Sequence, residues 1–175
     1  SGDSTSGSAG FELEEEGTAK IERETVLTYG VKVFLLDQKG MIPESSVILM
    51  ARTPTSGIET DTHFLATWLV GWNVGSRWKI DAAMRYVTAS EEQDRFGIWS
   101  PSAVVKFEMA ERWNAHLEYF GFFSSGKAEQ FDRHYISPGV HYLVTDNLEV
   151  GVRVGWGLND QSSRFFANIG MGWRY

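Results

Sequence analysis

Hydrophobic and polar side chains alternate along most of this chain, with apolar residues at every second position. Successive side chains of a β-strand point to opposite faces of a sheet, so each alternating run predicts a strand with one apolar face. Nine runs follow this rule, at 27–35, 47–52, 64–73, 78–86, 101–109, 113–123, 137–144, 148–158 and 165–175. The pattern therefore predicts an all-β chain in which residues 25–175 form the strands.

The connections between these runs alternate in length. "GSR", "AER" and "TDN" are short, whereas "TSGIETDT", "SEEQDRFG", "SSGKAEQFDR" and "NDQSSR" are long; "DQKGMIPES" is an enlarged short turn. Tight turns at one rim and longer loops at the other are typical of outer-membrane barrels. The lengths favour an antiparallel up-and-down barrel that crosses a membrane with its strands.

The distribution of charge indicates which face of each strand points inward. A soluble β-sandwich turns its apolar face inward and its charges outward. Here the apolar face carries tryptophan and tyrosine at the strand ends, as in the aromatic girdles at membrane–water interfaces. These girdle residues are Trp78, Trp113, Trp156, Trp173 and Tyr175. The pattern favours a lipid-facing apolar side, and a soluble lipocalin-like barrel with an apolar interior is the alternative.

The last strand ends on an aromatic residue. Ile169, Met171, Trp173 and Tyr175 share one face of it. This ending resembles the C-terminal signature that the barrel assembly machinery of Gram-negative bacteria recognises. We therefore expect the bacterial outer membrane as the location, with its lipid, its lipopolysaccharide and this machinery as partners.

Strand parity predicts that the barrel needs more than nine strands. If the C-terminus is periplasmic, the last strand descends, and so does the first. Bacterial barrels have an even strand number with both ends periplasmic, so three further strands would give about twelve in total. Residues 1–24 are acidic and are expected to be a flexible extracellular loop or a truncated N-terminal segment. We expect the missing strands to belong to an N-terminal piece or to a partner protein.

Composition narrows the range of functions. The net charge of −7 argues against nucleic-acid binding through phosphates. The absence of cysteine excludes a disulfide scaffold and a thiolate metal site. No metal-ligand spacing and no phosphate-binding glycine loop is present, so we expect no cofactor. The acidic segments 12–24 and 91–94 could hold divalent cations against lipopolysaccharide phosphates, or they are solvated loop charge.

The inward-facing residues divide into two zones along the barrel axis. We name the first the charged belt; it contains Lys79, Asp81, Arg85, Lys106, Glu108, His116, Glu118, His141, Glu149, Arg153 and Arg174. We name the second, nearer the long loops, the apolar cup; it contains Leu65, Ile98, Phe120, Phe122, Tyr135 and Phe166. Two interpretations follow. In the first, the apolar cup receives a solute above a charged constriction. In the second, the charges pair across strands and stabilise the barrel wall, and the aromatic rings fill the barrel opening.

Enzymatic motifs are weaker. Ser137 and His141 share a face, but four residues of strand span about 13 Å, too far for a hydrogen bond. His116 and Glu118 are same-face neighbours that fit the charge network. A lipid hydrolase built from cross-strand residues remains an alternative, and the expectation is that the protein is not an enzyme.

Three segments resemble one family of Gram-negative outer-membrane barrels. They are "RTPTSG" at Arg52–Gly57, "SPGVHYLVTDNLEVGVRVGWGLND" at Ser137–Asp160 and "FFANIGMGWRY" at the C-terminus. The family is labelled "transporter / putative MetA-pathway of phenol degradation". The resemblance implies passive passage of small, aromatic or amphipathic solutes. A scaffold barrel that docks a partner protein is the alternative.

Overall fold

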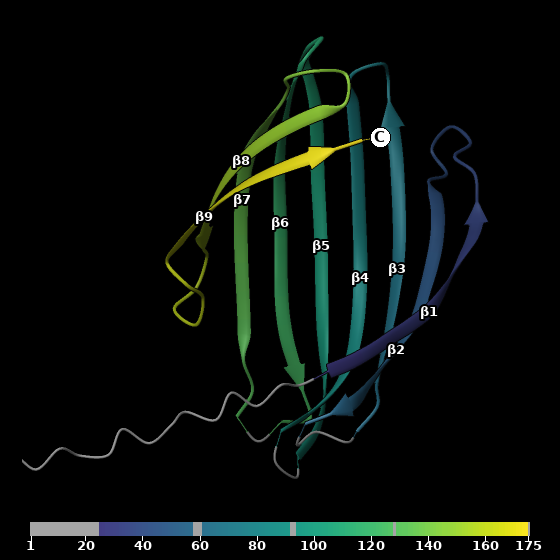
Figure 1. The fold of residues 1–175 in the computed structure, drawn as a ribbon, viewed down its shortest axis with the longest axis vertical. Helices are drawn as coiled ribbons and strands as arrows, with labels where there is room; N and C mark the ends of the chain where they lie inside the picture. The colour runs from purple at the N-terminus through teal and green to yellow at the C-terminus, as the bar shows by residue number, and fades with distance from the viewer. Residues whose placement is uncertain (1–24, 58–60, 92–93, 128, 175) are drawn as a thin grey trace, which may run out of the picture.

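The computed structural model describes residues 25–57, 61–91, 94–127 and 129–174. These residues form one antiparallel sheet whose nine strands are hydrogen-bonded in chain order (Figure 1). The strands are β1 (Thr25–Leu36), β2 (Glu44–Ser56), β3 (His63–Val74), β4 (Trp78–Glu91), β5 (Asp94–Ala110), β6 (Trp113–Ser125), β7 (Asp132–Leu143), β8 (Leu148–Gly157) and β9 (Phe165–Trp173). The predicted all-β, up-and-down architecture is confirmed. The acidic segment 1–24 and Tyr175 lie outside the described residues.

Several strands extend beyond the predicted runs, and β7 begins at Asp132 rather than at residue 137. The weakest predicted strand, at 47–52, extends over Glu44–Ser56, and Thr55 donates its hydroxyl hydrogen bond to the Thr25 carbonyl. The prediction of a long loop at 90–97 is wrong, because β4 and β5 continue as a hairpin in which Glu91 pairs with Asp94. Backbone pairing does not require apolar side chains, so a hairpin can extend beyond the apolar part of its strands.

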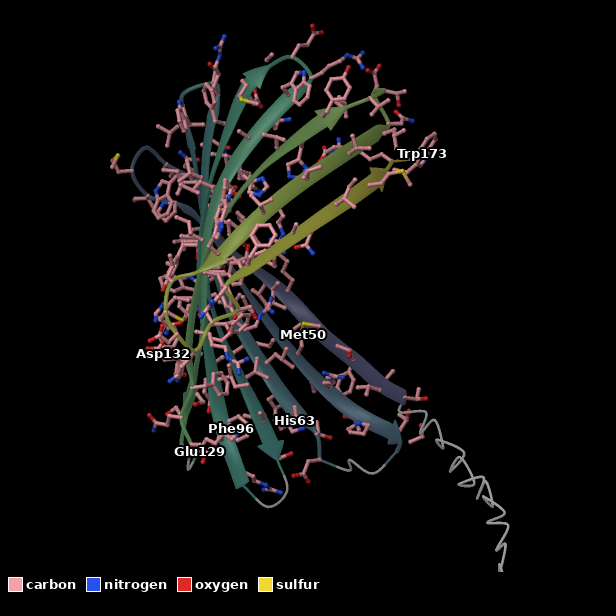
Figure 2. All side chains as sticks on the ribbon, turned by 90° about the vertical axis from the view of Figure 1, so that its left-hand side faces the viewer. Met50, His63, Phe96, Glu129, Asp132 and Trp173 are labelled. Carbon is pink, nitrogen blue, oxygen red and sulfur yellow. The ribbon has the colours of Figure 1, made fainter. Side chains whose placement is uncertain are left out.

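The sheet is curled, and β1 and β9 curve over the same face of the central strands (Figures 1 and 2). On that inner face side chains meet across intervening strands: the Phe120 and Phe166 rings on β6 and β9 are 6.0 Å apart, and Lys79 on β4 reaches Glu44 on β2. Ring contacts described on the other face join neighbouring strands, as in Trp78–Phe107, Tyr86–Trp99 and Trp113–Tyr142. The inner face is therefore the concave one.

The sheet is open within the described residues, since no pairing joins β1 to β9. It has the form of a partial barrel. No helix in the described ranges is long and apolar enough to cross a bilayer.

The two rims of the sheet differ. Short turns connect β3 to β4, β5 to β6 and β7 to β8, and Gly75 supplies a positive φ of 64° in the first of these. Figure 2 shows Trp173 toward this rim, while His63, Phe96 and Glu129 lie toward the opposite rim. The β1–β2 connection at 37–43 folds against β3, where Gln38 binds the backbone of Asn73 and the Trp72 indole donates to the Met41 carbonyl. The predicted alternation of turns therefore holds for every connection except β4–β5.

The sheet has almost no core. Among the described hydrophobic residues only Ala51 and Tyr135 are buried. The convex face instead exposes large apolar side chains; Leu117 is 48% exposed, Val152 49% and Ile169 83%. Monomeric soluble proteins rarely expose contiguous apolar surface on this scale. The convex face therefore requires an apolar neighbour.

Candidate functional site: the inner face of the sheet

One part of the charged belt lies on β2, β4 and β5. Asp81 is its centre, with its carboxylate 2.9 Å from the Lys106 ammonium and 3.7 Å from that of Lys79. The Lys79 ammonium also lies 3.4 Å from the carboxylate of Glu44. Gly71 pairs with both Glu44 and Asp81, and its missing side chain leaves room for the two carboxylates to converge. These groups form one ion network on the inner face.

Sequence reasoning missed Glu44, although Glu44 lies in phase with the inward side of the 47–52 run. The predicted strand began too late to include it. A carboxylate two residues before an inward serine was the available signal.

The other part of the belt lies on β6, β7 and β8. The Arg153 guanidinium donates to Glu118 at 2.9 Å and to the Asn168 side chain at 3.2 Å. The His141 imidazole Nδ1 lies 2.9 Å from the Glu149 carboxylate. The His116 and His141 rings are 5.0 Å apart. Asn168 was not predicted as a site residue, although it shares the face of Phe166 on β9.

Gly139 allows the side chains of His116 and Arg153 to lie flat along the inner face of the sheet. Gly139 on β7 stands in register between His116 on β6 and Arg153 on β8. A Cβ at residue 139 would lie 2.7 Å from His116 Nε2 and 2.9 Å from Arg153 Cβ, which is closer than real contacts allow. The ion pair of Arg153 with Glu118 therefore passes over a glycine.

The structure does not join the whole belt into one network. Arg85 donates only a 3.4 Å hydrogen bond to the Thr67 hydroxyl among the described residues. Glu108 and Arg174 line a hollow of about 460 Å³ near the short turns, together with His141 and Glu149. In the described part of the chain neither Glu108 nor Arg174 forms an ion pair within 4 Å.

The aromatic members of the apolar cup do meet. Phe120 stacks on Tyr135 at 4.9 Å and contacts the Phe122 ring edge-on at 6.0 Å. Phe166 joins them from β9, and the Arg153 guanidinium lies 5.6 Å above its ring. The aliphatic members lie elsewhere along the sheet, because Leu65 and Ile98 each pair with Val87 of β4.

Aromatic pairs mark both ends of the convex face. Trp78–Phe107 and Trp113–Tyr142 lie near the short turns, at 4.4 and 4.7 Å between ring centroids. Toward the long loops lie Trp156–Phe165 at 6.0 Å and Tyr86–Trp99 at 4.7 Å. Trp99 was not predicted, because the fifth run was taken to begin at Pro101. Ile169, Met171 and Trp173 are exposed along β9.

Ser137 and Ser162 both donate hydrogen bonds to backbone carbonyls. Ser137 is fully buried and donates to the Val154 carbonyl at 2.8 Å. Ser162 donates to the His134 carbonyl at 3.0 Å, while the imidazole of His134 contacts Tyr119 and Asp132. Neither hydroxyl is oriented by an imidazole in the way that nucleophilic catalysis requires. Within the described residues no three His, Asp or Glu side chains are grouped to hold a metal ion.

Comparison with known proteins supports the family resemblance. No curated protein matches the chain. A family model described as "Putative MetA-pathway of phenol degradation" matches residues 9–175, a range that includes every strand from β1 to β9. The predicted family is therefore confirmed, and the chain belongs to the family described as "Putative MetA-pathway of phenol degradation".

Proposed function

We propose that the protein is an outer-membrane β-barrel that mediates passive passage of small solutes along its inner face. The observation that carries this proposal is the reversed polarity of the sheet. Ion pairs occupy the concave face, and exposed aliphatic and aromatic side chains occupy the convex face. A bilayer core satisfies an apolar exterior, and a water-filled interior satisfies a charged one.

The inner face offers a solute two successive environments. The aromatic cluster around Phe120 lies toward the long loops, and the ion networks around Asp81 and Arg153 lie toward the short turns. Charges of both signs lining a pore favour small hydrated or amphipathic solutes over ions of one sign. This arrangement supports passage without a covalent step.

The proposal includes closure of the sheet by further strands. The outer edges of β1 and β9 leave backbone hydrogen-bonding groups unpaired within the described residues. Unpaired backbone groups are costly in hydrocarbon, so spanning sheets are closed. We propose that strands of the same protein or of a partner pair with these two edges.

Single-channel conductance of the native protein in a planar bilayer tests the proposed function. We expect steady ohmic steps, because a closed wall with charged lining holds water. The absence of conductance steps from folded, inserted protein would overturn the proposed channel function. It would favour the scaffold function, in which the barrel docks a partner protein without conduction.

Replacing Asp81 with asparagine is expected to increase anion selectivity. Asp81 is the described acidic partner of Lys106 and shares Lys79 with Glu44. One unit charge about 10 Å from an ion in water is worth about 0.4 kcal/mol, or about twofold in the occupancy of each ion. The Asp81→Asn protein should therefore shift the reversal potential in a KCl gradient toward chloride by a permeability ratio of about four.

The matched control for this prediction is Asp61→Asn. Asp61 also pairs with a cation, Arg95 at 3.1 Å, but the pair lies outside the charged belt. Equal shifts for both variants, or no shift for Asp81→Asn, would contradict the placement of Asp81 on the conduction path.

A further inference from the structure

A hollow of about 250 Å³ lies on the inner face between β4 and β6. Arg85 forms one side of it, and Phe120 and Phe122 form the other. The floor is β5, where Ser100 pairs with Arg85 and Ser102 pairs with Phe120. The two small serine side chains between a long cation and two rings leave the space open. The hollow is thus bounded by a guanidinium and by aromatic surface.

Arg85 has unused hydrogen-bonding capacity in this hollow. Its Nε donates to the Thr67 hydroxyl at 3.4 Å, and its two terminal nitrogens have no hydrogen-bond partner among the described residues. These nitrogens form the planar fork that binds a carboxylate through two parallel hydrogen bonds. The hollow is therefore lined by a guanidinium whose two terminal nitrogens are unpaired in the described part of the chain.

The local charge also favours an anion. Arg153 and Glu118 line the same hollow, but their charges are already paired at 2.9 Å. Arg153 is further occupied by Asn168 and by the Phe166 ring. Among the described charged residues that line the hollow, Arg85 is therefore the one without an ionic partner, and a ligand with one negative charge would balance it.

The opposite wall is suited to a planar ring. Phe120 is held against Tyr135 at 4.9 Å and against Phe122 at 6.0 Å, in stacked and edge-to-face geometries. Phe122 remains 39% exposed. Aromatic pairs of this kind attract each other beyond the effect of the area that they bury. A ring lying against Phe122 would extend an existing cluster.

We propose that this hollow binds small single-ring aromatic acids, with the carboxylate on the Arg85 fork and the ring against Phe120 and Phe122. The inference rests on the proposed function, because it names the solute class that the inner face retains during passage. The volume suits one ring, since sites for drug-sized molecules begin at about 300 Å³. A neutral aromatic alcohol would leave the charge of Arg85 unbalanced, and an aliphatic acid would leave the rings uncovered.

Calorimetric titration of the folded native protein with benzoate tests the proposal. We expect saturable binding, tighter by about tenfold than for acetate and for benzyl alcohol. Arg85→Gln should weaken benzoate binding about tenfold and leave benzyl alcohol binding within twofold. Arg85→Lys should fall between the two, because an ammonium keeps the charge and loses the fork.

The control is Lys32→Gln, which removes one positive charge from the inner face at another hollow. It should leave benzoate affinity within twofold. Each variant is first shown to be folded by heat-modifiable migration in electrophoresis, and its KCl conductance is recorded separately. Suppose that the native protein conducts normally. An unchanged benzoate affinity in Arg85→Gln, or acetate binding as tight as benzoate binding, would then overturn the aromatic-acid site alone. If the native protein shows no conductance, the proposed function is overturned instead.

Discussion

Replacing Ala103 with lysine is expected to lower the free energy of unfolding in lipid vesicles by about 2–4 kcal/mol. Ala103 is exposed on the convex face of β5, midway between Trp99 and Phe107. These two residues belong to aromatic pairs at the opposite ends of the apolar surface. A lysine at this depth would place its ammonium near the centre of the bilayer, where charge is most costly.

The neighbouring substitution Val104→Lys is the matched control. Val104 faces the other way, and its register places it between Asp81 on β4 and Glu118 on β6. A lysine there meets carboxylates and water, so we expect a change within about 0.5 kcal/mol. Urea unfolding followed by tryptophan fluorescence measures both variants. Equal losses for Ala103→Lys and Val104→Lys would contradict the assignment of the two faces.

Replacing Gly139 with valine is expected to destabilise the protein by about 1–3 kcal/mol and to reduce its conductance. The new side chain would occupy the space in which His116 and Arg153 lie flat. Both must then turn toward the middle of the inner face, and Arg153 must leave Glu118. The unfolding free energy reports the lost packing, and single-channel conductance reports the obstruction.

Gly170→Val separates crowding from any general effect of replacing glycine in a strand. Gly170 lies on β9, and a Cβ there meets no described atom within 4 Å. Both substitutions replace a flexible glycine with a β-branched residue, so the gain in strand propensity is shared. We expect Gly170→Val to stay within about 0.5 kcal/mol of the unchanged protein. A loss as large as that of Gly139→Val would refute the crowding explanation.

The sequence predicted the strands and their faces well because period-2 alternation is imposed by the pleat itself. A strand with one face in lipid and one in water alternates between apolar and polar residues, as β6 does from Trp113 to Tyr119. The pattern is weakest where both faces are apolar or polar. That is why β2 was predicted too short and the β4–β5 hairpin was taken for a loop.

The pairing of charges could not be predicted in the same way. Lys79 meets Glu44, and Arg153 meets Glu118, because the register offsets each pair by only two residues across an intervening strand that carries a glycine. Register is set by interstrand packing and turn geometry, which a single strand does not encode. The sequence also gave no sign that Arg85 would differ from the other cations, because its isolation depends on what its neighbours bind.

Site-directed spin labelling along β6 tests the opposite placement of lipid and water most directly. The chain contains no cysteine, so a single nitroxide can be attached at each of residues 114–119 in turn. In bilayers we expect oxygen accessibility to peak at 115, 117 and 119, and accessibility to a water-soluble nickel complex to peak at 114, 116 and 118. The reverse phase, or equal accessibility at all six positions, would contradict an apolar exterior around a hydrated, charged inner face.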